Sequence, residues 1–232
     1  MTRFPALSLL ALLTAGSLAA QVGHPPDQSP YRDITHANGL LFTYGHVGGS
    51  GGSLGVGPHS ADGWGLRYDV RLSGLLGAHL GFSHFSGVRD AYNPDDSVAK
   101  RRMGPVTQSV TLLGVGMQAN LTGAKSWHRL APFIDGEIGA AIGSAIAADS
   151  TSFYTFGTKL YLEPGAGAEL YVTDRFRVRF DARLLFWNLK YPSSFFQVPT
   201  QQPTGAPIIP SGGSASEWTA TSWFGIGLHY AF

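Results

Sequence analysis

The sequence predicts an all-β protein: an eight-stranded antiparallel transmembrane up-and-down β-barrel with an N-terminal signal peptide. Three observations support this fold class. Hydrophobicity alternates with a period of two residues along eight segments, the connections between these segments are alternately short and long, and the charges within them keep to one face. Beyond the first twenty residues, no apolar run reaches the roughly 18 residues of a membrane-spanning helix, so membrane insertion has to use strands.

The first twenty residues have the layout of a secretory signal peptide. Arg3 supplies a positive charge, an apolar run follows over residues 9–13, and small residues at 17–20 suit a signal peptidase. Cleavage after Ala19 and cleavage after Ala20 fit the pattern equally well. The predicted organisation is a signal peptide over 1–20, a polar periplasmic leader over 21–38, and the barrel over 39–232.

Eight segments have the alternation of strands with one apolar face, at about 40–48, 64–73, 76–86, 106–121, 131–145, 159–172, 176–189 and 218–232. Short turns such as 74–75 and 173–175 alternate with long loops at 49–63, 87–105, 146–158 and 190–217. The last loop contains five prolines, and proline cannot donate to a central ladder. Short turns at one end and long loops at the other are typical of a membrane barrel.

The charged residues of these strands predict a lumen filled by paired charges. Six are positive and six negative, and each shares a face with the other charges of its strand. An eight-stranded barrel has an interior that side chains fill, where buried charges are tolerated when they are paired. The predicted network consists of Arg67, Asp69, Arg71, Asp135, Glu137, Lys159, Glu163, Glu169, Arg177, Arg179, Asp181 and Arg183.

Composition indicates which face points outwards and excludes several classes of protein. Only 13% of the residues are charged, against about 25% on average, which leaves little charge to solvate the wall of a soluble barrel. The outer face of the last predicted strand, from Trp218 to Phe232, has no charge. Sixteen basic against 15 acidic residues argue against nucleic acid as a partner, and the lack of cysteine excludes disulfides and thiolate metal sites.

The end of the chain carries a resemblance to a known family. Gly227, Tyr230 and Phe232 resemble the C-terminal assembly signal of bacterial outer-membrane β-barrels, and residues 39–232 are similar to small OmpA/OmpX-type eight-stranded barrels. The resemblance implies a place in the outer membrane, contact with its lipid and lipopolysaccharide, and recognition by the barrel-assembly machinery. It also implies that long loops face the cell surface, where they are available to a ligand.

The predicted role is structural or surface-recognition and non-enzymatic, with no catalytic residue, cofactor or metal site. Two alternatives stay open: a narrow small-solute channel and a lipid A deacylase-like hydrolase. His84 and Ser86 resemble the His-x-Ser pair of the deacylases, in which histidine activates the serine. However, Gly87 stands where that family has asparagine, and no glutamate occurs between Ser86 and Glu137.

Three further features have a structural and a functional interpretation. His79 and His229 lie on the lumenal face of their strands, where we expect them to pack as polar groups rather than to bind metal. The basic run 100–102 lies in a long loop beside Asp95 and Asp96, and we expect it to be solvated. Its functional alternative is a contact with lipopolysaccharide phosphates.

The assembly signal generates a prediction. Phe232→Ala should lower the amount of protein in the outer membrane more than Phe186→Ala does, because only Phe232 belongs to the assembly signal. Phe186 is the control, since its side chain also lies on the predicted outer face of a strand. The measurement is the level of each variant in fractionated cells. Equal levels of the two variants would contradict the signal.

Overall fold

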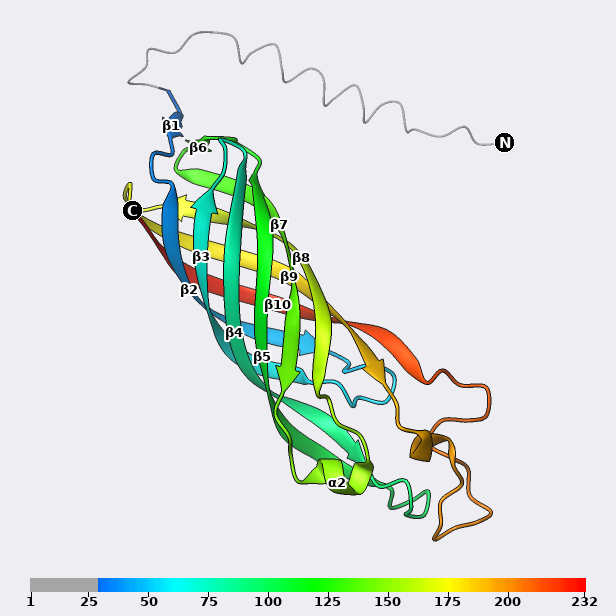
Figure 1. Ribbon diagram of the computed structural model, residues 1–232. Helices are drawn as coiled ribbons and strands as arrows, with labels where there is room; N and C mark the ends of the chain where they lie inside the picture. Colours follow the sequence, from blue (N-terminus) through cyan, green and yellow to red (C-terminus); the bar gives the residue numbers. More distant parts are fainter. Residues whose placement is uncertain (1–28) are drawn as a thin grey trace, which may run out of the picture.

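The computed structural model describes residues 29–232; the predicted signal peptide and the first part of the leader lie outside them. Eight antiparallel strands form a closed barrel, in which each strand pairs with the next and the last pairs with the first (Figure 1). The strands are β2 (Asn38–Gly49), β3 (His59–Arg71), β4 (Leu76–Tyr92), β5 (Arg102–Asn120), β7 (Leu130–Gly143), β8 (Thr158–Tyr171), β9 (Phe176–Lys190) and β10 (Ser216–Ala231).

The helices of the described part are two short pieces in the long loops. They are α2 (Ala148–Ser152) and the 3-10 helix η3 (Ser193–Phe196). Within residues 29–232, no helix is long and apolar enough to cross a membrane. The prediction of an all-β, eight-stranded barrel is therefore confirmed.

Several strands are longer than predicted at the long-loop end. Strand β4 continues to Tyr92 and β5 begins at Arg102, so most of the expected loop 87–105 is a hairpin with a connection of residues 93–101. Outward positions there include Ser86 and Ser109, which hydrogen-bond to each other at 2.7 Å. The alternation of apolar residues therefore stops before the ladder does, and hydrophobic periodicity placed the strand ends too early.

A short strand pair at the other end was not predicted. Strand β1 (Tyr31–Asp33), in the expected leader, pairs with β6 (Lys125–Trp127) in the turn between β5 and β7. Ile34 is buried with Ala131 and Tyr171 of β7 and β8, while the following chain enters β2. The leader therefore crosses the short-turn end of the barrel, where it is visible beside β6 in Figure 1.

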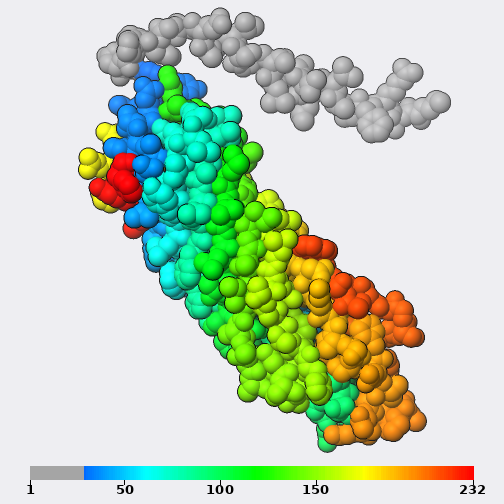
Figure 2. All heavy atoms as spheres, in the orientation of Figure 1, coloured from blue at the N-terminus to red at the C-terminus, as the bar shows by residue number. Residues whose placement is uncertain are grey.

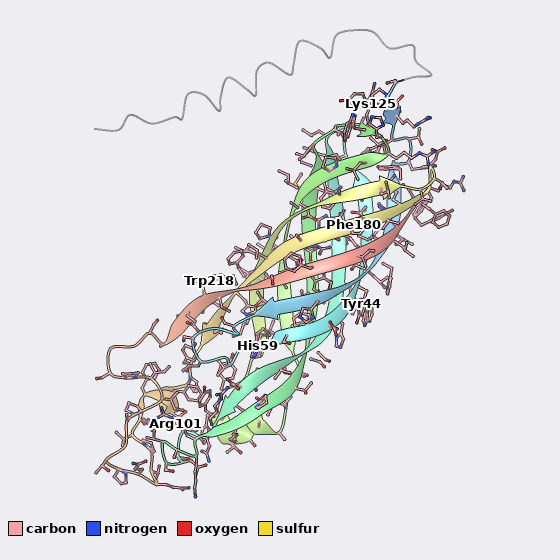
Figure 3. The ribbon with its side chains drawn as sticks, turned by 180° about the vertical axis from the view of Figure 1, so that it is seen from behind. Tyr44, His59, Arg101, Lys125, Phe180 and Trp218 are labelled. Atoms are coloured by element: carbon pink, nitrogen blue, oxygen red, sulfur yellow. The ribbon has the colours of Figure 1, made fainter. Side chains whose placement is uncertain are left out.

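The outer wall is apolar, the reverse of a soluble protein. The outward side chains of every barrel strand include exposed large hydrophobic residues; Leu228 is 65% exposed and Phe224 62%. Figure 3 shows Tyr44, Phe180 and Trp218 around this wall, which also forms the flank of the elongated molecule in Figure 2. Along β3 and the residue that follows it, the belt runs from Trp64 to Leu72, nine residues, which matches the ~9–11 residues of a transmembrane strand.

Glycines on the inner wall make room for large lumenal side chains. A Cβ on Gly114 would overlap the Tyr161 hydroxyl and the Glu137 carboxylate, and a Cβ on Gly116 would overlap the His79 ring. The glycine excess of the sequence thus has a packing role at these two positions, because a bare backbone lets charged groups from other strands fill the lumen.

Gly116→Ala should destabilise the barrel by about 1–3 kcal/mol, because the methyl group would be forced against His79. The matched control is Gly136→Ala on the adjacent strand, where a Cβ meets nothing within 4 Å. Urea unfolding of both variants in detergent measures the difference. Equal midpoints for the two variants would mean that lumen packing does not require Gly116.

Candidate functional site: the filled lumen and its two ends

Arg179 is the centre of the charge network in the half of the lumen near the short turns. It comes from β9 and has no solvent exposure. Its Nε donates to Asp181 at 2.7 Å and its Nη2 to Asp135 at 2.8 Å, and the guanidinium stacks 3.7 Å above the Phe133 ring. Its Nη1 donates to Gln118 at 2.6 Å. One cation thus joins side chains from β5, β7 and β9.

The other arginines extend this network around the wall. Arg67 of β3 donates to Asp135 and Gln118, the same groups that Arg179 uses. Arg183 bridges Glu163 at 3.0 Å and Asp181 at 3.2 Å. Further ion pairs join Arg67 to Asp69, at 2.7 Å, and both Arg177 and Arg179 to Glu169, at 3.1 and 3.3 Å. The network therefore crosses the lumen and blocks its cross-section with charged side chains.

Two buried histidines belong to the same network. His79 Nε2 lies 3.1 Å from Glu137, which also accepts a hydrogen bond from the Tyr161 hydroxyl. His229 Nδ1 lies 3.3 Å from Glu169. Both rings contact carboxylates of the lumen, and within the described residues no group of three or more acidic or histidine side chains could hold a metal ion.

Ten of the twelve predicted lumenal charges are brought together, and two are not. Arg71, at the end of β3, donates to the carbonyl of Ile34 in the leader. Lys159, at the start of β8, lies 5.1 Å from the centre of the Phe156 ring. Neither forms an ion pair with another described residue. The ten that interact comprise four arginines and six carboxylates, so the two histidines are the remaining basic groups among them.

The half of the lumen near the long loops is apolar, a feature that was not predicted from the sequence. The inner face of β9 carries Arg179, Asp181 and Arg183 and then changes to Leu185, Trp187 and Leu189, each with no solvent exposure. The change from charged to apolar residues along the inner face of β9 is the sequence signal that could have predicted this apolar half. These side chains join a buried cluster with Phe85 of β4, Val110 and Leu112 of β5, and Trp223 of β10.

Three long loops insert side chains into this apolar half. Val56 comes from residues 50–58 and Phe156 from residues 144–157. Phe195, Ile208 and Ile209 come from residues 191–215. Phe195 is fully buried, and its ring packs against those of Tyr92, Tyr154 and Tyr191 at centroid distances of 6.2–6.5 Å. The long loops therefore pack over the long-loop end of the barrel and close it (Figure 1).

Polar contacts hold the inserted loops in place. Buried Arg89 of β4 pairs with Asp149 of α2. The Tyr191 hydroxyl donates to Glu217, which also accepts from the Ser53 amide at 2.7 Å. Burial and this hydrogen bond raise the pKa of Tyr191 to about 12, so the hydroxyl keeps its proton near neutral pH. These contacts join loops 50–58 and 191–215 to the strand ends.

The two loops farthest from the barrel wall bind each other. The Asp95 carboxylate accepts from the Thr200 hydroxyl at 2.9 Å, and the Asp95 backbone carbonyl accepts from the Gln201 backbone N–H at 3.0 Å. Arg101 donates to the carbonyl of Ala206 at 2.8 Å, and exposed Arg102 pairs with Asp90. Of the basic run 100–102, Arg101 therefore joins the two loops, Arg102 forms an ion pair within the β4–β5 hairpin, and Lys100 is exposed.

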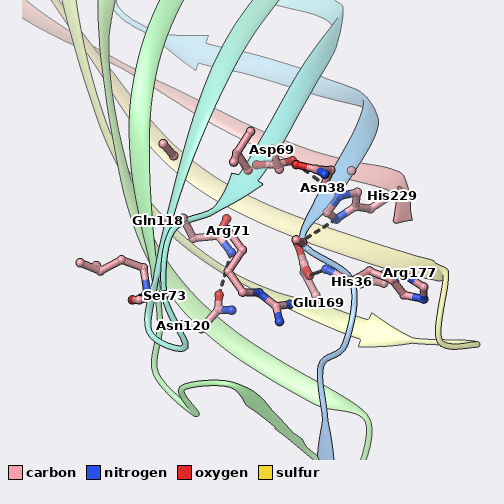
Figure 4. Close-up of a pocket in the computed structure, with 16 residues that line it drawn as sticks. His36, Asn38, Asp69, Arg71, Ser73, Gln118, Asn120, Glu169, Arg177 and His229 are labelled. Atoms are coloured by element: carbon pink, nitrogen blue, oxygen red, sulfur yellow. Dashed lines mark hydrogen bonds and ion pairs between the residues drawn. The ribbon is translucent and has the colours of Figure 1, made fainter. Parts of the chain in front are cut away.

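The leader lies across part of the opposite mouth of the lumen. Ile34 donates its N–H to the carbonyl of Ala124 and accepts from Arg71. Below it lies a polar cavity of about 50 Å³ that is lined by Asp69, Glu169 and His229 among others (Figure 4). His229 Nε2 and Asp69 lie 3.7 Å apart there, too far for a direct hydrogen bond. The cavity is polar and large enough for water.

The residues of the possible hydrolase site do not face one another as a pair. His84 Nδ1 lies 3.0 Å from the Thr111 hydroxyl, and Ser86 bonds to Ser109.

Of the predicted assembly signal, Gly227 is buried in the wall, while Tyr230 and Phe232 are exposed at the short-turn end. Their role in assembly stays a prediction.

Comparison with known proteins supports the fold. No protein-family model and no curated protein gives a significant match. Among solved structures, the outer membrane protein OprG from Pseudomonas aeruginosa has a TM-score of 0.50 at 10% identity, with 86% of this chain and 99% of that chain covered. Neisserial surface protein A has a TM-score of 0.48 at 10% identity, covering 88% and 98%. The N-terminal barrel domain of Pseudomonas aeruginosa OprF has 0.44 at 13%, covering 84% and 100%.

The apolar wall, the closed eight-stranded ladder and the likeness to OprG define the class of this protein. It has the fold of the small outer-membrane β-barrels, and it is a protein of the cell outer membrane. In such barrels the short turns face the periplasm and the long loops face the cell exterior. In this chain the leader lies at the short-turn mouth, and the long loops close the opposite end.

Replacing Arg179 by methionine should destabilise the barrel by about 3–5 kcal/mol, because Asp135, Glu169 and Asp181 would lose their shared cation. Lys159→Met is the control: it removes the same charge from the lumenal face, but Lys159 has no carboxylate partner there. Urea unfolding in detergent compares the two. An Arg179→Met variant as stable as Lys159→Met would show that the ion pairs do not support the barrel.

Proposed function

We propose that this protein is a closed scaffold that holds an ordered platform of loops at the cell surface for a structural or recognition role, without enzymatic activity. The observation that carries the proposal is the burial of Phe195, Ile208 and Ile209 from the longest loop in the apolar cluster at the outer end of the barrel. A loop that is anchored in this way keeps a defined shape, as a recognition surface requires.

The arrangement of the lumen supports a scaffold over a channel. A solute would have to displace the buried aromatic side chains around Phe195, then the ion pairs of Arg179, and finally the leader at Ile34. Each barrier consists of packed side chains or paired charges, and removing the partner of a buried charge is costly. Conduction would need three separate rearrangements.

The platform also presents apolar side chains outside the membrane belt. Phe153 is 57% exposed beside α2, and Val98 and Val198 are 41% and 48% exposed on the two interlocked loops. Phe153 has a positive φ of 55°, a conformation that costs energy for a residue with a side chain. Exposed apolar residues on a rigid surface are typical of contact sites, so these three are the first candidates for ligand contact.

Planar bilayer recordings test closure. The purified protein should give no unit conductance, because the packed loops and the ion-paired layer both block the lumen. A variant in which a short Gly-Ser turn replaces residues 193–213 should also stay silent, since the Arg179 layer remains. Steady unit currents from the unmodified protein would refute the closed scaffold and favour the channel.

Display of the platform can be tested on intact cells, because the chain has no cysteine of its own. Thr204→Cys in the longest loop should react with a membrane-impermeant maleimide. The matched control is Ala124→Cys, at an equally exposed position of the periplasmic end, which should react only after the cells are lysed. Labelling of Ala124→Cys alone on intact cells would reverse the orientation and overturn the proposal.

A further inference from the structure

The exposed rim at the periplasmic end carries an excess of positive charge. We define this basic rim as Arg32, Lys125, Arg129 and Arg175, all of which are exposed. The exposed acidic residues at this end of the described chain are Asp33 and Asp174. When buried groups outside the interacting network are counted as well, this end of the described chain has five basic residues, the rim and Arg71, against the same two acidic ones, whereas the long-loop end has six basic and six acidic groups. Charge asymmetry therefore marks one end of the molecule and not the other.

Aromatic side chains accompany the basic rim. In the β1–β6 ladder, Tyr31 lies opposite Trp127 and Asp33 lies opposite Lys125. Tyr31 is 49% exposed and Trp127 48% exposed, although both lie beyond the ends of the barrel strands. The Lys125–Asp33 pair is long, at 3.9 Å, and both partners are exposed, so the lysine is available to another anion.

The turn that follows β6 is held in a strained conformation. Trp127 pairs with Leu130, so His128 and Arg129 are the two residues of a tight turn. Their φ angles are +48° and +69°, as a type I′ turn requires, and Asn-Gly is the preferred sequence for such a turn. Strain of this kind concentrates at functional sites, and here it fixes an exposed arginine at the tip of the basic rim.

The rim continues directly from the lipid-facing belt. Leu121 is 60% exposed before β6, and Val172 and Phe176 are 53% and 54% exposed on either side of the turn that contains Arg175. Tryptophan and tyrosine favour the headgroup layer of a membrane, and lysine and arginine beside it are attracted to anionic lipids. The positive charge of the basic rim and its position beside the lipid-facing belt therefore indicate anionic lipid headgroups as its ligand.

We propose that the basic rim binds anionic phospholipid headgroups of the periplasmic leaflet, with Lys125 and Arg129 as the main phosphate contacts and Trp127 in the headgroup layer. Arginine and lysine both donate to phosphate oxygens, and Arg129 can do so with two parallel bonds. The β1–β6 ladder positions these side chains at the membrane surface, which gives the extra strand pair a role beyond covering the lumen.

Lipid selectivity measured by electron spin resonance tests this proposal. The full chain is reconstituted in phosphatidylcholine vesicles with spin-labelled phosphatidylglycerol or phosphatidylcholine, and the preference is the ratio of the two association constants. The Lys125→Glu, Arg129→Glu double variant should lower the preference for phosphatidylglycerol by roughly two- to fivefold. The control, Lys100→Glu with Lys190→Glu, makes the same charge change on two exposed residues of the long-loop end and should keep the preference.

An equal preference in the unmodified protein and the rim variant, or an equal fall in both variants, would overturn the proposal. Heat-modifiable gel mobility shows that each variant is folded, and Lys125→Gln with Arg129→Gln serves if the reversed charges prevent folding. A second variant, His128→Asn with Arg129→Gly, relieves the strain of the turn and removes the arginine side chain. It should raise the urea midpoint, because Asn-Gly suits a type I′ turn, and lower the lipid preference, because the phosphate contact is lost. An unchanged preference in this relaxed turn would exclude Arg129 as a contact.

Discussion

The burial of charge around Arg179 is the constraint on which the rest of the structure depends. Closing the backbone ladder in lipid requires a complete ring of strands, and an eight-stranded ring has a lumen that side chains must fill. This chain fills the half near the short turns with four arginines and six carboxylates, and removing any one of them takes an ion-pair partner from at least one other buried group. The glycines at 114 and 116 follow from the same constraint, because charged groups from other strands occupy their space.

Beyond the ion pairs, the other half of the lumen is packed with apolar side chains. Beyond Arg183 the inner face of β9 is formed by Leu185, Trp187 and Leu189, and the long loops bury aromatic and aliphatic groups against this surface. The two halves contribute differently. The ion pairs are demanding in geometry and join many strands, whereas the apolar half accepts side chains from segments far apart in the sequence. The loops are ordered because the outer lumen offers them an apolar surface to bury.

The parity of side chains along each strand was sufficient to predict the barrel, its eight strands and the face that carries the charges. It could not predict which charges meet, because contacts across a lumen depend on the stagger between strands, and parity does not fix that stagger. Arg71 and Lys159 share the parity of the network but lie at opposite ends of it. The β1–β6 ladder was missed because three-residue strands are too short to show a period.

The same reasoning explains why the two ends of the barrel differ in purpose. At the outer end the apolar side chains turn inwards from the loops, so the exterior keeps a balanced set of charges and a compact surface. At the periplasmic end the leader buries Ile34 over part of the mouth, and the adjoining strand pair leaves Trp127 and Arg129 exposed. A segment needed only to close the lumen would not require a strained two-residue turn with an arginine at its tip. We therefore infer that Ile34 contributes to closing the lumen, whereas Trp127 and Arg129 of the adjoining β1–β6 strand pair bind the membrane surface.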